Sequence, residues 1–385
     1  MKLKDKINQI LILLKTELLR FHVRRGKPGE KNKILVVRLD GIGDFFLWLD
    51  HARIIRKYYA DAEVTLLCSK LWRDAAEKLL DYDRVIPFEG YRFLTNWKYR
   101  RDLLQYLKEY AYDIVIQPRC SRDFILEDQI TRFCSAPENI AFRSSKRSFN
   151  PPLMKVSDKW YNQLYSLPDE VTGEKAINEF FTGKLTEQTG HEVKQQLHQE
   201  KTIPPLVEIP GEWTKRPYFI IIPGAADPGR RWPPEKFADA VNQLQQNHQV
   251  RCIICGSESD KTAAKIIIEE NKSDKLLDLT GKTTILQLVE LIRKSEFVLS
   301  NDTGAVHIAS YFGIKSVCIL GGGHWGRFLP YDDDTSSPSC AFHQLNCYRC
   351  DWKCIYPRAS NKPYFCVQSV NVSDVLEAAE KLNII

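Results

Sequence analysis

The chain has 385 residues, of which 43% are hydrophobic and 27% are charged, as is ordinary for a globular protein. Its length exceeds what one hydrophobic core normally organises, so we expect two domains of similar size. The sequence shows no tandem repeats, which argues against solenoids and propellers. Residues 1–150 carry 29 Lys+Arg against 20 Asp+Glu, whereas the rest carries 26 against 29. The first part therefore favours an anionic partner, and without a nucleic-acid-binding signature we expect phosphorylated lipid and no nucleic acid.

Residues 1–30 predict a basic, amphipathic helix. Apolar residues recur at helical spacing from Ile7 to Phe21, and lysines and arginines occupy the other face. The longest apolar run, Ile10 to Leu14, is too short for a signal peptide or a membrane span. Two interpretations remain open: a helix lying on an anionic membrane surface, or a helix packed on the first domain with solvated charges.

Short apolar strands then alternate with helices, which is typical of βαβ units around a parallel sheet. The expected strands in the first half are 33–39, 63–68, 84–88 and 113–118, with helices near 44–59, 72–80 and 99–109. Residues 150–215 are less regular, and Pro204, Pro205 and Pro210 mark a linker. We expect an N-terminal helix over 1–30, a first domain over 31–205 and a second over 206–385.

The alternation restarts after the linker. The expected strands are 218–224, 250–256, 275–279, 296–300 and 315–320. The expected helices begin after Pro234 and near Glu258, Ile285, Ala305 and Ser373. The sequence thus predicts a second doubly wound α/β domain.

The segment Asn301-Asp302-Thr303-Gly304 lies at a strand-to-helix corner, where open parallel sheets bind their ligands. Asp302 or Thr303 can cap the helix, leaving backbone N–H groups that suit a phosphate or diphosphate. Capping alone does not explain His307, which lies one turn further on the same side. We interpret the corner as an anion site contacted by His307.

Three more corners carry candidate groups. Asp44 follows the first strand, and we expect either an N-cap or a general base. Arg230 stands before a helix start, where a guanidinium suits a diphosphate, although a solvated loop charge is the alternative. Glu258 can accept hydrogen bonds from ribose hydroxyls or serve only as a first-turn carboxylate. The segment Gly41-Ile42-Gly43-Asp44 lacks the third glycine of a dinucleotide fingerprint, which disfavours an NAD-dependent enzyme.

The combination of R-L-D-G-I-G-D (Arg38–Asp44) with N-D-T-G-A-V-H (Asn301–His307) resembles glycosyltransferase family 9, the ADP-heptose:lipopolysaccharide heptosyltransferases and their relatives. The resemblance runs in family order over roughly residues 33–375. It implies the GT-B fold, in which two Rossmann-like, doubly wound domains face each other across a cleft, here with an added N-terminal amphipathic helix. It also implies inverting, metal-independent transfer from a nucleoside-diphosphate sugar, with ADP and heptose favoured. The implied acceptor is a lipopolysaccharide core or another lipid-linked saccharide.

The resemblance also implies roles for individual residues. Asp44 matches the family's proposed catalytic base, and Arg230 stands where the family usually has a phosphate-contacting lysine. The implied donor-binding residues are Gly224, Arg230, Glu258, Asp302, Thr303, Gly304 and His307. The acceptor-side candidates are Arg38, Gly43 and Arg119. Hydroxyl residues common in the family's loop are replaced here by Ala225 and Ala226.

Eleven cysteines are many for one chain, and Cys347, Cys350, Cys354 and Cys366 form a C-x2-C-x3-C-x11-C pattern. Four thiolates at this spacing can hold zinc or an iron–sulfur cluster. We favour structural thiols or a local disulfide over a structural zinc, and we expect a reducing compartment to disfavour disulfides. The acidic run Asp332-Asp333-Asp334 is interpreted as a solvated loop, so no metal or other cofactor is required.

The sequence therefore predicts a glycosyltransferase that is cytoplasmic and peripheral on the inner face of the cytoplasmic membrane. Two alternatives from other classes remain. A nucleotide-sugar epimerase or phosphorylase of the same fold would turn over donor without an acceptor. A non-catalytic nucleotide-sugar-binding protein would bind donor and show no turnover.

Overall fold

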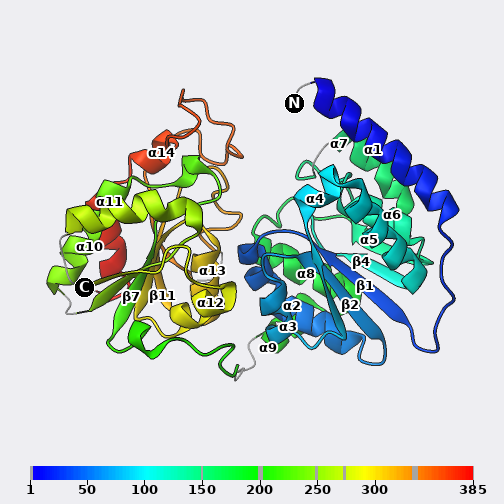
Figure 1. Ribbon diagram of the computed structural model, residues 1–385, viewed down its shortest axis with the longest axis horizontal. Coiled ribbons are helices and arrows are strands. Elements are labelled where there is room, and N and C mark those ends of the chain that lie inside the picture. The colour runs from blue at the N-terminus through cyan, green and yellow to red at the C-terminus, as the bar shows by residue number, and fades with distance from the viewer. Residues whose placement is uncertain are drawn as a thin grey trace. The chain divides into compact units, whose positions relative to one another are not determined.

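The computed structural model describes residues 3–148, 151–197, 203–247, 250–271, 275–331 and 337–384 (Figure 1). The chain forms two compact units. The first unit comprises Met1–Gly41, Trp48–Val171 and Ala176–Lys201, and the second comprises Ile42–Leu47, Thr172–Lys175 and Thr202–Ile385. The acidic run at Asp332-Asp333-Asp334 lies outside the described residues.

The first unit is built on a parallel sheet of six strands in the order β3-β2-β1-β4-β5-β6. Its strands are β1 (Lys33–Arg38), β2 (Glu63–Ser69), β3 (Arg84–Phe88), β4 (Ile114–Gln117), β5 (Glu138–Phe142) and β6 (Gln163–Tyr165). The central strand β1 is buried from Ile34 to Arg38. Such continuous burial is expected where helices cover both faces of a parallel sheet.

Helices alternate with these strands along the chain. They are α1 (Leu3–His22), α2 (Ile42–Tyr58), α3 (Arg73–Leu79), α4 (Gly90–Thr95), α5 (Trp97–Tyr110), α6 (Glu127–Cys134), α7 (Pro151–Ser157), η1 (Asp158–Trp160), α8 (Glu174–Thr186) and α9 (Gly190–Leu197). Leu35 and Val37 project from one face of β1 and pack with Leu104 and Leu107 of α5. The apolar stripe of α5 therefore anchors that helix to the sheet.

The second unit repeats this design, in the strand order β12-β11-β10-β7-β8-β9. Its strands are β7 (Tyr218–Ile222), β8 (Arg251–Ile254), β9 (Leu276–Asp278), β10 (Phe297–Asn301), β11 (Lys315–Ile319) and β12 (Ser339–Ala341). Its helices are η2 (Gly211–Trp213), η3 (Pro228–Arg230), α10 (Pro234–Asn247), η4 (Glu258–Asp260), α11 (Lys261–Asn271), α12 (Ile285–Arg293), α13 (Gly304–Tyr311), α14 (Phe365–Gln368) and α15 (Val372–Glu380). Strands β7 and β10 pair in parallel at the centre, both fully buried.

The prediction that residues 150–215 are irregular is wrong, because this stretch contains α7, η1, β6, α8 and α9. The sequence pattern does not predict these elements, because β6 has only three residues and α7 begins with two prolines. Strand β5 was also not predicted. It contributes Ile140, Ala141 and Phe142 to the core.

Helix α1 has two apolar faces. The inner face packs on the first unit through Leu19 and Val23, and the Arg100 Nε donates a hydrogen bond to the buried Thr16 hydroxyl at 2.8 Å. The outer face, as far as its side chains are described, exposes large apolar groups: Ile10, Leu11, Leu14, Leu18 and Phe21. Neither interpretation of the sequence anticipated a helix that packs and also exposes apolar surface. None of the described helices is long and apolar enough to cross a membrane.

Candidate active site

The carboxyl end of β10 leads directly into α13 in the second unit. Thr303 is the N-cap residue of α13, and its hydroxyl accepts a hydrogen bond from the Ala305 backbone N–H at 3.3 Å. Of the two capping candidates, Thr303 therefore has this role, and Asp302 is available for other contacts. The first turn of α13 still presents backbone N–H groups and the positive end of the helix dipole.

Asn301 holds this corner together, a role that the sequence did not reveal. Its side chain is fully buried, and its Oδ1 accepts a hydrogen bond from the Trp232 backbone N–H at 3.0 Å. Its Nδ2 donates to the carbonyl oxygens of Pro223 at 2.7 Å and Gly224 at 3.2 Å. One amide thus ties the loop after β7 to the end of β10. The sequence does not distinguish Asn301 from the polar residues that follow it, so it does not predict that Asn301 joins these two segments.

Arg230 lies at the end of η3, beside Asp302. Its Nη1 is 3.4 Å from the Asp302 Oδ2, and its guanidinium lies 5.7 Å from the centre of the Trp352 ring. The exposed fraction of the Arg230 side chain is 25%. A guanidinium held by one carboxylate and an aromatic ring still has N–H donors available for a diphosphate.

His307 is a neutral group in this site. Burial lowers the pKa of His307 to about 4, against a smaller opposing effect of the Asp302 carboxylate. Its Nδ1 lies 2.7 Å from the Tyr331 hydroxyl. A neutral imidazole offers one donor and one acceptor, so His307 is suited to hydrogen bonding rather than to charge pairing.

The N-terminal part of α2, Ile42–Leu47, belongs to the second unit and packs on α13. A Cβ atom added to Gly43 would lie 2.7 Å from the His307 Cδ2. A Cβ atom added to Gly304 would lie 2.5 Å from the Ile42 Cγ2 and 3.1 Å from the Gly43 backbone nitrogen. Both positions therefore require glycine for this close approach.

Asp44 lies in this same turn of α2. The helix begins at Ile42, so Asp44 is in the first turn and the expectation that it caps the helix is wrong. The site thus collects Asp44 with Asp302, Thr303, Gly304, His307 and Arg230 in one compact unit.

Asp260, rather than Glu258, stands against the loop that carries Gly224. A Cβ atom added to Gly224 would lie 2.4 Å from the Asp260 carboxyl carbon. Asp260 also accepts a hydrogen bond from the Ser257 backbone N–H at 2.8 Å, completing a capping box. Glu258 is exposed and pairs with Lys261 at 2.6 Å. The capping-box spacing from Ser257 to Asp260 could have identified Asp260 from the sequence.

The cysteine-rich segment packs on the glycine loop that follows β11. Cβ atoms added to Gly322 and Gly323 would clash with the rings of Tyr348 and Trp352, at 2.1 and 2.2 Å. Trp352 also donates a hydrogen bond from its Nε1 to the His324 Nδ1 at 3.2 Å. This segment therefore places the Trp352 ring against Arg230. The cysteine pattern in the sequence did not predict this contact.

None of the eleven cysteines, all of which lie in the described part of the chain, forms a disulfide. The described residues contain no group of three or more His, Cys, Asp or Glu side chains arranged to hold a metal ion, and they include Cys347, Cys350, Cys354 and Cys366.

The acceptor-side candidates Arg38 and Arg119 lie in the first unit, Arg38 as the last residue of β1 and Arg119 just beyond β4. Arg38 is fully buried, and its Nε lies 2.8 Å from the Asp40 Oδ2. Arg119 lies 2.8 Å from the Glu127 Oε1. Burial raises the pKa of Glu127 to about 7, although the neighbouring Arg119 opposes the shift. Both arginines are thus held by carboxylates that the sequence pattern did not single out.

The fold and the site together define a glycosyltransferase with the GT-B fold. The fold matches that of Escherichia coli ADP-heptose lps heptosyltransferase II, with a TM-score of 0.62 and 20% identity over 91% of this chain and 98% of that one. It also matches Escherichia coli heptosyltransferase WaaC with ADP-2-deoxy-2-fluoro heptose, with a TM-score of 0.64 and 14% identity over 91% and 99%.

The family model for glycosyltransferase family 9 (heptosyltransferase) matches residues 100–353, and the chain belongs to this family. A lipooligosaccharide heptosyltransferase 2 of Campylobacter jejuni is 25% identical over 42% of this chain and half of its own length. Lipopolysaccharide heptosyltransferase 2 of Salmonella typhimurium is 22% identical over 75% of this chain and 82% of its own length. The resemblance drawn from the two motifs is thereby confirmed.

Proposed function

We propose that this glycosyltransferase moves a heptose from an ADP-linked donor to a lipopolysaccharide core or another lipid-linked saccharide. The observation that carries the proposal is the packing of the Gly43–Asp44 turn on the first turn of α13. This packing supports the proposal because Asp44 follows Gly43 directly and the helix N-terminus is suited to a diphosphate. The names of the family relatives support heptose and a lipopolysaccharide-type acceptor.

In this proposal Asp44 removes the proton from an acceptor hydroxyl. The acceptor oxygen attacks the anomeric carbon from the face opposite the nucleotide, so the new bond forms as the bond to the diphosphate breaks and the configuration inverts. Negative charge then develops on the leaving diphosphate. Arg230 and the N-terminus of α13 stabilise that charge, and the mechanism uses no metal ion or other cofactor.

Residues 206–385 supply the donor side of this mechanism. Gly224 lets the loop after β7 approach the nucleotide closely, and neutral His307 donates or accepts one hydrogen bond at the donor. Glu258 is proposed to hold the ribose because it is exposed and lies beside the carboxyl end of β8. Residues 31–205 supply the acceptor side, with Arg38 and Arg119 near the acceptor and Gly43 clearing its approach.

We further propose that the protein is peripheral on the inner face of the cytoplasmic membrane, attached by α1. The outer face of α1 exposes five large apolar side chains, and Lys15, Arg24 and Lys27 are exposed in and just after the helix. An amphipathic helix with basic residues is the expected means of binding anionic lipid. The cysteine-rich segment is proposed to be structural, without zinc.

A thermal-shift panel with ADP, UDP, GDP and their sugars tests the donor assignment, on wild type and His307→Ala. A ligand at about 100 times its dissociation constant stabilises the folded state by about 2.7 kcal/mol. We expect the largest shift with ADP-heptose and a much smaller shift in the variant. An equal shift with every nucleotide, or an unchanged shift in His307→Ala, would contradict the proposed donor site.

A transfer assay with ADP-heptose and a lipopolysaccharide-core acceptor then separates this function from its alternatives. Release of ADP that depends on acceptor supports transfer. Donor turnover without acceptor would instead identify an epimerase or phosphorylase, and binding without turnover would identify a non-catalytic protein.

A further inference from the structure

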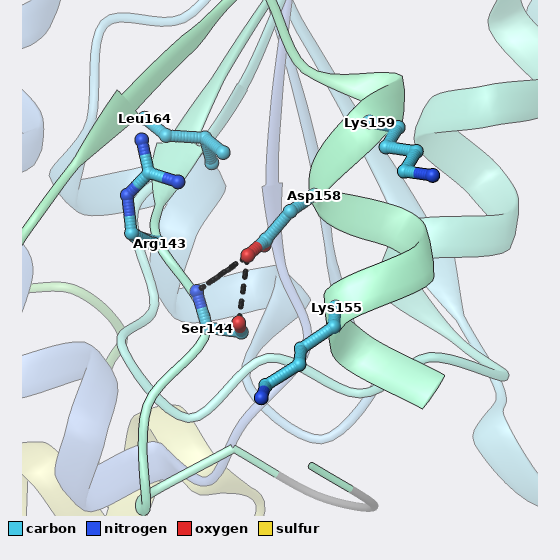
Figure 2. Close-up of a pocket in the computed structure, with 6 residues that line it drawn as sticks. All are labelled: Arg143, Ser144, Lys155, Asp158, Lys159 and Leu164. Atoms are coloured by element: carbon cyan, nitrogen blue, oxygen red, sulfur yellow. Dashed lines mark hydrogen bonds between the residues drawn. The ribbon is translucent and has the colours of Figure 1, made fainter. Parts of the chain in front are cut away.

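The first unit contains a pocket of about 480 Å³ that the proposed mechanism does not use (Figure 2). It opens where β5 ends, between that strand end and the segment from α7 to β6. It is lined by Arg143, Ser144, Lys155, Asp158, Lys159 and Leu164. In doubly wound sheets, ligands bind beyond the carboxyl ends of the strands, and Arg143 and Ser144 directly follow β5. The volume is suited to a small organic ligand rather than to a single ion.

The pocket and its loop are strongly basic. Residues 143–159 contain five Lys or Arg residues and one Asp. Arg143 and Lys155 lie on opposite sides of the pocket, whereas the Lys159 ammonium points away from them (Figure 2). The side chains of Arg143 and Lys155 are exposed, and within the described residues neither contacts a carboxylate. Two unpaired cations across a hollow favour an anionic ligand.

The charge of Asp158, the one carboxylate that lines the pocket, is partly offset by neighbouring groups. It forms an ion pair with the fully buried Arg122, and it accepts hydrogen bonds from the Ser144 hydroxyl at 2.6 Å and the Ser144 backbone N–H at 3.2 Å. These contacts consume its acceptor capacity, so Asp158 does not repel an anion as an isolated carboxylate would.

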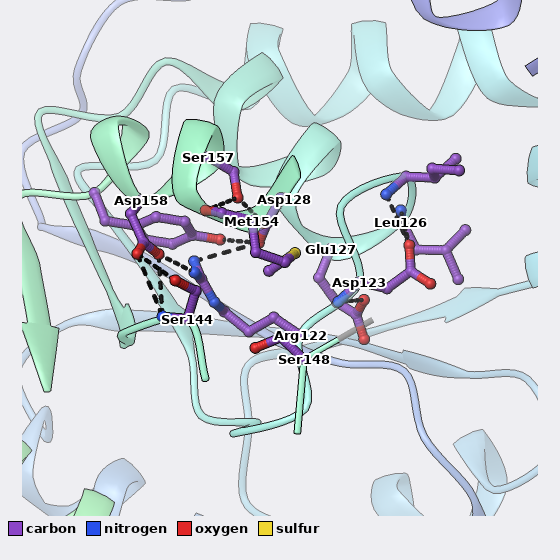
Figure 3. A network of polar contacts seen from close by, with 12 residues as sticks. Arg122, Asp123, Leu126, Glu127, Asp128, Ser144, Ser148, Met154, Ser157 and Asp158 are labelled. Atoms are coloured by element: carbon purple, nitrogen blue, oxygen red, sulfur yellow. Dashed lines mark hydrogen bonds and ion pairs between the residues drawn. The ribbon is translucent and has the colours of Figure 1, made fainter. Parts of the chain in front are cut away.

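A network of polar contacts surrounds Asp158 (Figure 3). Behind Asp158, the buried Asp128 accepts hydrogen bonds from the Ser157 hydroxyl and, at 2.6 Å, from the Tyr161 hydroxyl. Arg122 lies between the two carboxylates and pairs with both. This network holds the backbone at the end of β5 against the α7–η1 segment, and these are the segments that carry Arg143 and Lys155.

We propose that this pocket binds a phosphomonoester carried by a sugar or a lipid headgroup. Arg143 supplies a planar pair of N–H donors for two phosphate oxygens, and Lys155 supplies a point charge from the opposite side. The pocket's ability to bind phosphate rests on its own residues. Its assignment to the acceptor substrate rests on the proposed function, because the pocket lies in the acceptor-side unit.

Isothermal titration calorimetry of the full chain with glucose 6-phosphate tests the inference. The test variant is Arg143→Ala/Lys155→Ala, and the matched control is Lys57→Ala/Lys78→Ala, which removes two exposed cations from α2 and α3. We expect saturable binding by wild type and control, at least tenfold weaker in the test variant. Glucose, which lacks the phosphate, should not bind.

A second arm identifies the source of the phosphate. Sedimentation with phosphatidic acid vesicles, which carry a lipid phosphomonoester, is compared with phosphatidylcholine vesicles for the same three proteins. A test variant that loses vesicle binding but keeps glucose 6-phosphate binding would assign the pocket to a lipid headgroup. A test variant that loses glucose 6-phosphate binding but keeps vesicle binding would assign it to a phosphorylated saccharide. If the test variant matches the control in both arms, the inference is overturned. Neither arm requires donor or turnover, so failure of the proposed transfer activity would be seen separately.

Discussion

At the scale of single residues, the site contains two groups whose proposed roles differ in kind. Asp44 is proposed to move a proton, whereas His307 is proposed to bind. Asp44 shares its turn with Gly43, which touches His307, so position alone does not separate these roles. Substitution at each residue should separate them, because general-base catalysis and ligand binding fail in different measurements.

Replacing Asp44 by Ala should lower kcat for transfer by about 10²–10⁴-fold, because a positioned general base contributes that much. Donor-induced thermal stabilisation should remain, since Asp44 is not proposed to contact the donor. The control is Asp61→Ala, which removes an exposed carboxylate from the loop before β2. Full transfer activity in Asp44→Ala would eliminate Asp44 as the base.

His307 should make the free energy of unfolding depend on pH. Its folded-state pKa is about 4, below the unfolded value of about 6.5, so the unfolded state binds the proton more readily. The stabilising effect of neutral His307 is complete above pH 6.5 and is lost as the pH falls toward 4, by at most about 1.4 kcal/mol per pH unit. Urea unfolding between pH 4.5 and 7.5 should show a shallower dependence for His307→Gln than for wild type. Parallel curves would show that His307 titrates normally.

At the scale of elements, α1 shows how a helix can serve two surfaces. Its inner face is fixed by Thr16, Leu19 and Val23, and an ion pair joins Glu17 to Arg132 of α6 at 3.0 Å. Its outer face is therefore not needed for folding of the first unit. Substitutions there should alter membrane binding without altering stability.

The double substitution Leu14→Ser/Leu18→Ser should weaken binding to vesicles of anionic lipid by at least about tenfold, since each buried leucine contributes roughly 1.5–3 kcal/mol. Leu71→Ser/Ile355→Ser is the matched control, because both side chains are highly exposed and lie outside α1. Vesicle sedimentation measures the effect, and circular dichroism checks the fold. Equal binding by both double variants would exclude α1 as the anchor.

The elements also show where prediction from the sequence succeeds. Strands β7 and β10 consist of apolar runs bounded by turn residues, and the sequence identifies both. Strand β6 has only three residues, none of them fully buried, and its pairing with β5 defines it. The short peripheral elements are stabilised by pairing with a sheet whose other strands are distant in the sequence. Their own residues therefore do not predict them.

The same distinction applies to the site. Thr303, Gly304 and His307 could be singled out because they follow a buried parallel strand, at the edge of the sheet where ligands bind. The role of Asn301 could not be assigned from the sequence, because its partner, the loop after β7, is distant along the chain. Contacts made after folding determine which of several polar neighbours binds ligand and which holds the backbone.

At the scale of the whole molecule, the uneven charge seen in the sequence resolves into two separate basic features. One is α1 with the residues just after it, and the other is the pocket at Arg143 and Lys155. Both belong to the first unit, whereas the donor site proposed for the second unit relies on a helix N-terminus and Arg230. Net charge could predict an anionic partner for the first half, but it could not show that two surfaces share the charge.

The burial of the cysteines gives the protein a built-in labelling site. Cys68, Cys120, Cys134, Cys252, Cys255, Cys318 and Cys366 are buried, whereas Cys347, Cys350 and Cys354 are partly accessible. Burial also raises the pKa of Cys340 to about 12, which suppresses its thiolate. A maleimide dye should therefore react first on the segment that carries Trp352 to Arg230. The native chain thus offers a place for a fluorescent reporter of nucleotide arrival without an engineered cysteine.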